Sequence, residues 1–165
     1  MIQLWENGNI THIQLRMVIS RLYDQYFQQW FSVLRTTQRL ETYGLIKNNF
    51  ELEKYLMCVK NDRHKLSLTK FRCSAHRLMI EEGRHLNIEK QDRLCNKCNM
   101  HAIENEYHFL LVCPFYRKTR ADILPRYYCH WPTLHKFKTL LTCPQSSVII
   151  KLAKFIYVAT LLRGE

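Results

Sequence analysis

Four side chains in the middle of the chain have the types and the spacing of a metal site. They follow the pattern Cys95-x2-Cys98-x9-His108-x4-Cys113. Two cysteines separated by two residues can bring both sulfur atoms onto one ion, and a loop of nine residues then returns a second ligand pair. Three thiolates and one imidazole complete a tetrahedron around Zn²⁺ and leave no position open for water. The spacing therefore predicts a structural zinc site that stabilises the fold and performs no chemistry.

The second ligand pair requires a break in the helix that carries it. The residues from Glu104 to Val112 have a helical pattern, but His108 and Cys113 are five positions apart. On one continuous α-helix that offset is about 140° of rotation, which is too far round to share an ion. Pro114 disfavours a helical conformation at the preceding residue and suits the first turn of a new helix. We therefore expect Cys113 at the corner between two helices, directed back toward His108.

Other interpretations of these residues are weaker. A CxxC pair can be redox-active, but the strand–turn–helix context of a thioredoxin-like motif does not surround Cys95 and Cys98. Cysteines can also be small buried hydrophobic residues. His101 is an alternative ligand, and we prefer His108 because a closing pair spaced four to five apart is usual. The cysteines without partner spacing are expected in the core or at incidental surface positions: Cys58, Cys73, Cys129 and Cys143.

Helices are the elements that must position this site. The chain is 47% hydrophobic but has only 4 Gly and 4 Pro, too few for a sheet-rich fold with recurrent tight turns. In residues 12–35, apolar and aromatic residues recur at spacings of three and four, and Thr11 is a suitable N-cap. This stripe predicts an amphipathic helix whose aromatic side chains pack in the core rather than form a base-stacking platform.

The rest of the chain divides into further helices with short connections. The helix that Ser67 opens is expected to end at Gly83, which can take the left-handed conformation after a helix. A serine at 146 or 147 is expected to cap the last helix. Helices are expected over 50–59, 67–82, 104–112, 115–124 and 147–162, with irregular segments at 35–49 and 126–144. The pattern predicts a mainly α-helical, small single-domain fold with one CCHC zinc knuckle, in three parts: 1–66, 67–126 and 127–165.

The chain is strongly basic, and its basic side chains concentrate in one stretch. The formal net charge is +11, and residues 60–77 contain one acid, Asp62. The Lys and Arg residues of this stretch are Lys60, Arg63, Lys65, Lys70, Arg72 and Arg77. Such an excess favours polyanions through counterion release. It predicts phosphate-driven binding of RNA or DNA with low base specificity, although a basic but inert surface is an open alternative.

Several other classes of function lack their signals. The chain has no apolar run of 18 residues for a membrane span, and the first ten residues lack the pattern of a signal peptide. We therefore expect a nuclear or cytoplasmic protein with reduced cysteines and no membrane partner. There is no Gly-rich phosphate loop and no G-x-S-x-G motif. The close acidic pairs, Glu81–Glu82 and Glu104/Glu106, are attributed to helix ends, so we predict no active site and no small-molecule substrate.

Three runs of the sequence occur in a distinctive order: LTKFRCSAHRLMIEEGRH, RLCNKC and IENEYHFLLVCPFYRKTR. In this order they resemble the C-terminal region of reverse transcriptases from non-LTR retrotransposons. The resemblance covers roughly residues 35–162 and is most specific in residues 68–120. It implies that Cys95, Cys98, His108 and Cys113 bind zinc in a knuckle that follows the polymerase and thumb. It also implies that this tail helps to hold template RNA or target DNA.

The sequence departs from the resembled family in its catalytic parts. It contains neither an endonuclease nor a polymerase palm with its paired aspartates. The prediction is therefore a non-catalytic, zinc-stabilised nucleic-acid-binding tail fragment and not an enzyme. Two alternatives stay open at this point: a structural or protein-interaction helical zinc module, and a non-functional remnant of a mobile element.

Overall fold

The computed structural model describes residues 11–164 and confirms that the fold is mainly α-helical. In the described part of the chain, extended pairing is limited to one isolated antiparallel bridge between Leu94 and Ile103. The chain forms two compact units, with the division between Gln38 and Arg39. The candidate metal ligands and the basic stretch both belong to the second unit.

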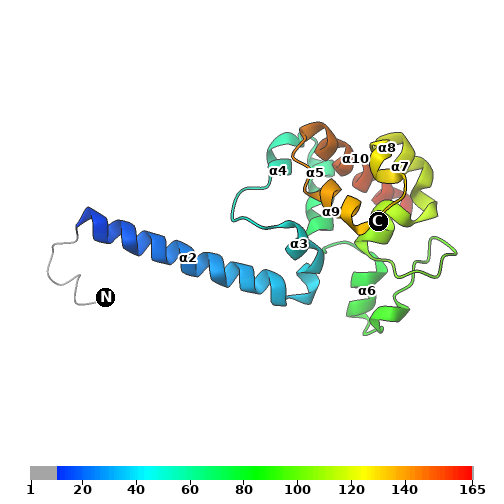
Figure 1. The fold of residues 1–165 in the computed structure, drawn as a ribbon. Helices are drawn as coiled ribbons and strands as arrows, with labels where there is room; N and C mark the ends of the chain where they lie inside the picture. The colour runs from blue at the N-terminus through cyan, green and yellow to red at the C-terminus, as the bar shows by residue number, and fades with distance from the viewer. Residues whose placement is uncertain (1–10, 165) are drawn as a thin grey trace. The chain divides into compact units, whose positions relative to one another are not determined.

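The first unit contains the long helix α2 (His12–Thr36), which confirms the predicted helix (Figure 1). Thr11 is its N-cap, and Gln14 completes a capping box: the Thr11 hydroxyl accepts from the Gln14 N–H, and the Gln14 side chain accepts from the Thr11 N–H. The expectation that the aromatic stripe packs in the core is wrong, since Tyr23 is 57% and Tyr26 68% exposed. Instead, aromatic rings of α2 contact one another along the helix surface.

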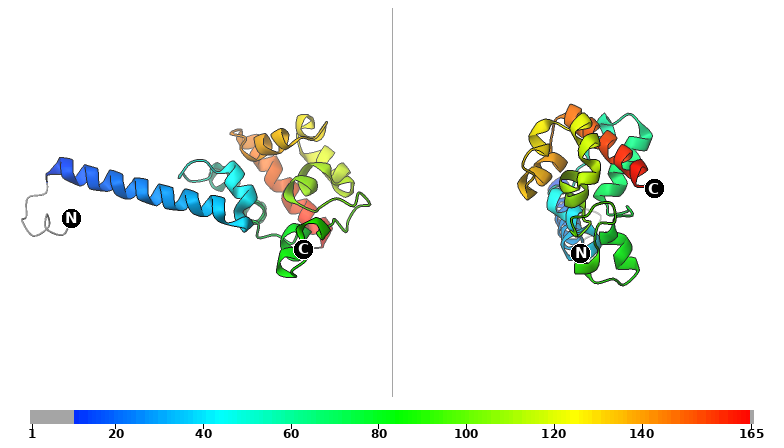
Figure 2. Two further views of the ribbon diagram at one scale, coloured as in Figure 1. Left: turned by 60° about the horizontal axis from the view of Figure 1, so that its bottom comes forward. Right: turned by 90° about the vertical axis from the view of Figure 1, so that its right-hand side faces the viewer.

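The second unit is built around its last helix, α10 (Ser146–Arg163), which runs through it (Figures 1 and 2). This helix packs against α5 (Asp62–Arg72), α4 (Lys54–Cys58), α7 (Arg117–Ile123) and α9 (Leu134–Leu141). Its buried face is Val148, Ile149, Leu152, Ala153, Phe155, Ile156 and Ala159.

Among the described helices, none alone has the length and apolar character to cross a membrane; α9 and α10 meet that test only as a pair bent by 108°.

The helix predicted over 67–82 is wrong, because the chain breaks in the middle of that range. Helix α5 ends at Arg72, and α6 (Met79–His85) begins only after an irregular segment. Ser74 has a positive φ of 50° at the break, and its hydroxyl donates to the Glu106 carboxylate at 3.2 Å. Phe71 and Leu78, on either side of the break, are both buried. Their spacing of seven residues is that of one helix face, which led to the wrong prediction although the backbone between them is irregular.

The shorter elements differ from expectation mainly in the segment predicted to be irregular. It contains α8 (Arg126–Cys129) and α9, the latter capped by the Thr133 hydroxyl, which accepts from the Lys136 N–H at 3.2 Å. Gln145, without a side-chain bond, is the N-cap of α10, so the expected serine cap is wrong. The helix predicted over 115–124 is confirmed as a 3-10 turn followed by α7. The segment 35–49 contains a 3-10 turn at Gln38–Leu40 and the helix α3 (Glu41–Ile46).

Gly83 lies inside α6 rather than after a helix end, so the expected left-handed role is wrong. A Cβ at this position would lie 2.7 Å from Cγ of Arg93 and 3.0 Å from its Cδ. The Arg93 side chain cannot move aside easily, because its Nε donates to the Ile88 carbonyl and its Nη1 to the Ile80 carbonyl, both at 2.9 Å. Glycine is therefore required by close approach and not by backbone angle.

We expect Gly83→Ala to lower the free energy of unfolding by up to about 2 kcal/mol. Overpacking costs about 1–3 kcal/mol, which exceeds the gain of about 1 kcal/mol in helix propensity. Urea denaturation monitored by circular dichroism measures the change. Glu82→Ala is the matched control, since Glu82 is an exposed neighbour in the same helix, and it should change stability by less than about 0.5 kcal/mol. A Gly83→Ala variant that is more stable than the unmodified chain by about 1 kcal/mol, the full gain in helix propensity, would show that the Arg93 side chain moves aside without cost.

Candidate metal centre

The structure brings together the four side chains that the spacing predicted. One ligand atom from each of Cys95, Cys98, His108 and Cys113 lies within 4.8 Å of the other three. The sulfur atoms of Cys95 and Cys113 are 3.9 Å apart, and Cys98 Sγ is 3.4 Å from His108 Nε2. Ligands at ordinary zinc distances in a tetrahedron would be separated by about 3.8 Å and about 3.6 Å, respectively. The group can therefore hold a metal ion. The alternative ligand His101 is exposed and lies outside this group.

The first ligand pair lies on a tight turn between two short extended segments. The Cys95 N–H donates to the Ala102 carbonyl at 2.9 Å, and the Glu104 N–H donates to the Arg93 carbonyl at 2.9 Å. These bonds flank the isolated antiparallel bridge and close the loop that contains Cys98. Within the turn, the backbone N–H of Lys97 donates to the Cys95 sulfur. Such a bond stabilises negative charge on the sulfur, as a metal-bound thiolate requires.

The second ligand pair is joined by a π-helical turn, η3 (His108–Val112). The Cys113 N–H donates to the His108 carbonyl at 2.7 Å, which is the five-residue step of a π-helix. The wider turn brings residues five apart closer to one face than an α-helix does. The helix then ends, since Cys113 has ψ 121° and Pro114 opens the 3-10 turn η4 (Pro114–Tyr116). The corner predicted at Cys113 is confirmed, and the π-helical turn is an addition that the sequence pattern did not indicate.

Arg120 of α7 lies in the core and hydrogen-bonds to the carbonyl groups at the end of this turn. Its side chain is buried, and it donates from Nε to the Leu110 carbonyl at 2.8 Å and from Nη2 to the Cys113 carbonyl at 2.9 Å. Burial and the positive charge of Arg120 together lower the pKa of His108. The imidazole is therefore neutral at pH 7, which is the form that binds metals. Nothing in the sequence pattern signals this role beyond a basic residue inside a helix.

The two innermost thiols are protonated at neutral pH unless a metal displaces their protons. Burial raises the pKa of Cys95 and that of Cys113. The N–H of Lys97 acts in the opposite direction on Cys95, as does the N–H of Phe115 on Cys113, but burial has the larger effect. A metal that binds this group therefore competes with protons, and acid weakens its binding.

Glu104 and Glu106 lie at helix starts, as was expected from the sequence, since Glu106 is the first helical residue before His108 and Glu104 accepts at the first residue of α6; both also bond to distant segments. Glu104 is fully buried and accepts from the Met79 N–H at 2.9 Å and from the Cys95 thiol at 3.5 Å. It also forms an ion pair with Arg163 of α10. Glu106 is buried as well, and its Oε1 lies 3.1 Å from His76 Nε2. These two carboxylates connect the metal-site segment to α6, to α10 and to the chain break before α6.

The structure sorts the predicted basic set into exposed and buried side chains. Lys65 is partly exposed, with Nζ 3.5 Å from the Asp62 carboxylate. Arg72 is only 5% exposed, and it donates to the Glu53 carboxylate at 2.9 Å and to the Leu141 carbonyl at 2.8 Å. Its assignment to a nucleic-acid surface is therefore corrected: it is a core ion-pair residue. The exposed members are Lys60, Arg63, Lys70 and Arg77.

The ligand turn, the π-helical turn, Arg120 and Glu104 form one connected structure in the second unit. They present a Cys3His group that can hold a metal ion, with a basic surface on α5 in the same unit. In comparisons with known proteins, no family model, no curated protein and no solved structure matches this chain.

Proposed function

We propose that this chain is a non-catalytic, zinc-stabilised module that binds RNA or DNA, derived from the tail of a retrotransposon-type reverse transcriptase. The observation that carries the proposal is the exposed basic surface of residues 60–77, formed by Lys60, Arg63, Lys70 and Arg77. The one acid in this stretch, Asp62, is paired with Lys65. The resemblance of residues 68–120 to the reverse-transcriptase tail supports the same class of ligand.

The metal in this proposal is zinc. A set of three thiolates and one imidazole suits Zn²⁺ better than hard cations, which prefer oxygen ligands. The 3.9 Å and 3.4 Å separations between ligand atoms fit a tetrahedral ion. Four protein ligands fill all the coordination positions, so the ion stabilises the fold and leaves no place for a reactive water.

The basic surface extends from α5 toward α10. Arg63 and Lys70 are seven residues apart on α5, which places them on one face of the helix. Burial and the nearby charge of Lys154 on α10 lower the pKa of His64, which is next to Arg63 in α5, so a further basic side chain lies close to this end of the helix. A surface of this kind releases counterions when it meets a phosphate backbone, and its binding is steeply dependent on salt.

We expect replacement of Lys60, Arg63, Lys70 and Arg77 by glutamine to weaken the binding of single-stranded RNA and duplex DNA. The slope of log K against log salt should become shallower by roughly 0.7–0.9 for each phosphate that is no longer neutralised. Fluorescence anisotropy across a salt series measures this. A matched variant replaces four exposed basic residues elsewhere in the unit: Arg117, Lys118, Arg126 and Lys138.

Two outcomes would contradict the proposal. If the zinc-loaded chain binds neither nucleic acid at low salt, the module does not bind nucleic acid. If the two four-residue variants lose affinity equally, binding depends on overall charge and not on the surface of residues 60–77. Unchanged circular dichroism of both variants is the control for folding.

A protein-interaction role is the second candidate, and the exposed apolar face of α2 favours it. Tyr23 and Tyr26 are more than half exposed, and Val33 is 50% exposed. Large apolar side chains exposed along one helix are a feature of protein-binding surfaces. This role predicts a protein partner whose affinity is unchanged in the variant of residues 60, 63, 70 and 77.

A further inference from the structure

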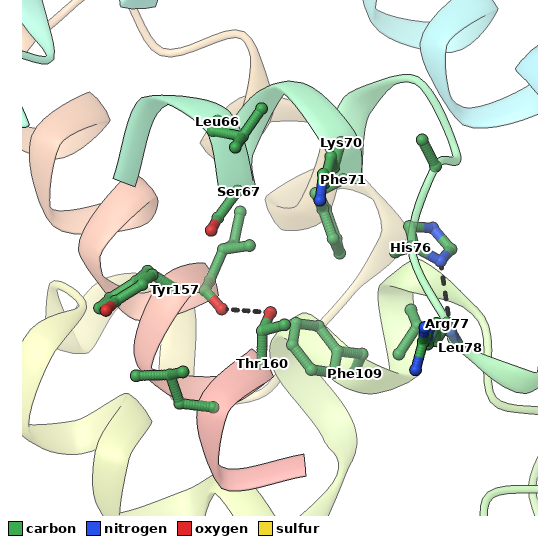
Figure 3. A pocket seen from close by; sticks show the side chains of 13 residues that line it. Leu66, Ser67, Lys70, Phe71, His76, Arg77, Leu78, Phe109, Tyr157 and Thr160 are labelled. Atoms are coloured by element: carbon green, nitrogen blue, oxygen red, sulfur yellow. Dashed lines mark hydrogen bonds between the residues drawn. The ribbon is translucent and has the colours of Figure 1, made fainter. Parts of the chain in front are cut away.

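A groove with a cavity volume of about 300 Å³ lies between α5, the segment 75–78 and α10. Its floor is apolar, since Phe71, Leu78 and Phe109 line it and each is only 2% exposed. Lys70 and Arg77 also line the groove, and both are exposed to solvent. Figure 3 shows Lys70 and Phe71 extending from α5, Tyr157 and Thr160 from α10, and Phe109 between the two. The groove therefore combines an apolar floor with cationic edges.

We propose that this groove holds one unstacked base of a single-stranded nucleic acid while Lys70 and Arg77 bind the adjoining phosphates. The inference rests on the proposed function and names the form of nucleic acid that the module takes. A duplex keeps its bases paired and stacked, so it offers no base to a groove in a protein surface. A single strand can turn a base outward, and a flat apolar-faced ring then replaces water above the apolar floor.

The sides of the groove have the chemistry that a base requires. Tyr157 is half-buried, and its ring is 5.0 Å from the His64 ring at an angle of 45°, which holds it at the edge of the groove. An aromatic ring held in this way is a stacking partner for any of the bases. The Ser67 hydroxyl on the opposite helix can donate to or accept from a base edge. Stacking of this kind gives affinity with little sequence preference.

The charges of the groove favour a polyanion. Among the described lining residues there is no aspartate or glutamate, whereas Lys70 and Arg77 are both basic. The main chain at Arg77 is fixed, because its carbonyl accepts from Arg163 Nη2 at 3.0 Å. The aspartate and glutamate side chains of an acidic peptide would satisfy the same two charges, but they would not supply a flat ring for the apolar floor. The joint requirement for a ring and a phosphate favours a nucleic acid.

The metal centre holds the floor of this groove in place. Phe109 directly follows the ligand His108 in the π-helical turn. On the opposite side, Sγ of Cys95 lies 3.5 Å from the Glu104 carboxylate, and Glu104 pairs with the same Arg163 that bonds to Arg77. The metal ligands are thus connected both to the floor and to a cationic edge. Binding of a base should therefore require the metal-loaded fold.

The first test uses the unmodified, zinc-loaded full chain, so the folding of a variant is not in question. Fluorescein-labelled strands of about 12 nucleotides, within the site sizes of single-strand binders, are compared by anisotropy: oligo(U), oligo(dT), an abasic strand of the same length, and a duplex. We expect removal of the bases to weaken binding roughly five- to hundred-fold. Equal affinity for the abasic and the base-containing strand would overturn the proposal. The RNA and DNA strands show which sugar the site accepts.

The second test separates the base from the phosphates. Tyr157→Ala should weaken binding of oligo(dT) roughly five- to hundred-fold and leave binding of the abasic strand unaffected. The matched control is Tyr127→Ala, at an exposed tyrosine outside the groove, which should change the affinity for neither strand. The Lys70→Gln/Arg77→Gln variant should weaken both strands and make the salt slope shallower by roughly 0.7 for each phosphate that is no longer neutralised.

The outcomes distinguish this inference from the proposed function. Equal binding of duplex, intact strand and abasic strand would overturn the groove proposal and leave the phosphate-binding surface standing. Absence of binding to every nucleic acid at low salt would overturn both. Full displacement of oligo(dT) by polyglutamate of equal charge would show that the groove takes acidic peptides and would overturn base binding.

Discussion

Removal of the metal by a zinc chelator, or the substitution Cys98→Ser, is expected to unfold the second unit around residues 95–124. Structural zinc binds with about 10–16 kcal/mol, which is comparable to the whole stability of a typical domain at about 5–15 kcal/mol. The π-helical turn that carries His108 also supplies Phe109, Leu110 and Leu111 to the core, each at most 2% exposed. Loss of the metal ion that holds this turn therefore exposes core side chains and does not merely loosen a surface loop.

Helical circular dichroism and hydrogen exchange of peptides from residues 95–124 measure this unfolding. Native mass spectrometry of freshly purified, reduced protein should show one zinc ion per chain. Cys58→Ser is the matched control, because Cys58 is a half-buried cysteine of α4 outside the metal group. This variant should keep both the zinc and the helical signal. A chain that contains no zinc, or that keeps its exchange protection after chelation, would remove the structural metal from the proposal.

The metal ligands could be predicted because their relation is largely local in the sequence. The spacing defined two ligand pairs, and Pro114 showed where the helix between His108 and Cys113 had to end. The π-helical turn could not be predicted, since it depends on a one-residue difference in hydrogen bonding that Arg120 supports from another helix. Local spacing thus identifies the ligands, whereas their orientation depends on contacts formed only in the fold.

The basic stretch shows what a count of charges leaves out. Arg72 follows Lys70 by two residues, so on α5 the two side chains point to different sides. Arg72 is four residues after Leu68, which is 1% exposed, and therefore shares the buried face. Helical periodicity contained this signal, but the clustering of charge concealed it. The partner that makes burial of Arg72 tolerable, Glu53, is distant in sequence and had no local signature.

The break between α5 and α6 and the exposed stripe of α2 have a related explanation. Periodicity reports which residues share a face, but it reports neither what covers that face nor whether the backbone is continuous. Phe71 and Leu78 keep helical spacing across a break that Glu106 stabilises through Ser74. In α2 the spacing correctly predicted the helix, yet Tyr26 is exposed in this chain. Both errors concern long-range partners and not local propensity.

The substitution Glu104→Gln is expected to lower the free energy of unfolding of the zinc-loaded protein by about 3–5 kcal/mol. Glutamine keeps the size of the side chain and can still accept from the Met79 N–H. It removes the negative charge that neutralises Arg163, whose side chain is only 6% exposed in this pair. A buried guanidinium that has lost its counter-charge is the main source of the cost. Urea denaturation at constant zinc concentration measures it.

A double-mutant cycle separates the ion pair from the other bonds of Glu104. In the variant Glu104→Gln/Arg163→Met the uncompensated charge is gone, so the double variant should be more stable than Glu104→Gln alone. Glu41→Gln is the matched control, since Glu41 pairs with Lys90 at 3.2 Å but both side chains are more than 60% exposed. That substitution should cost about 0–1 kcal/mol. Additive effects of the two core substitutions would mean that Glu104 acts through its bond to Met79 alone, and that α10 is not connected to the metal centre by charge.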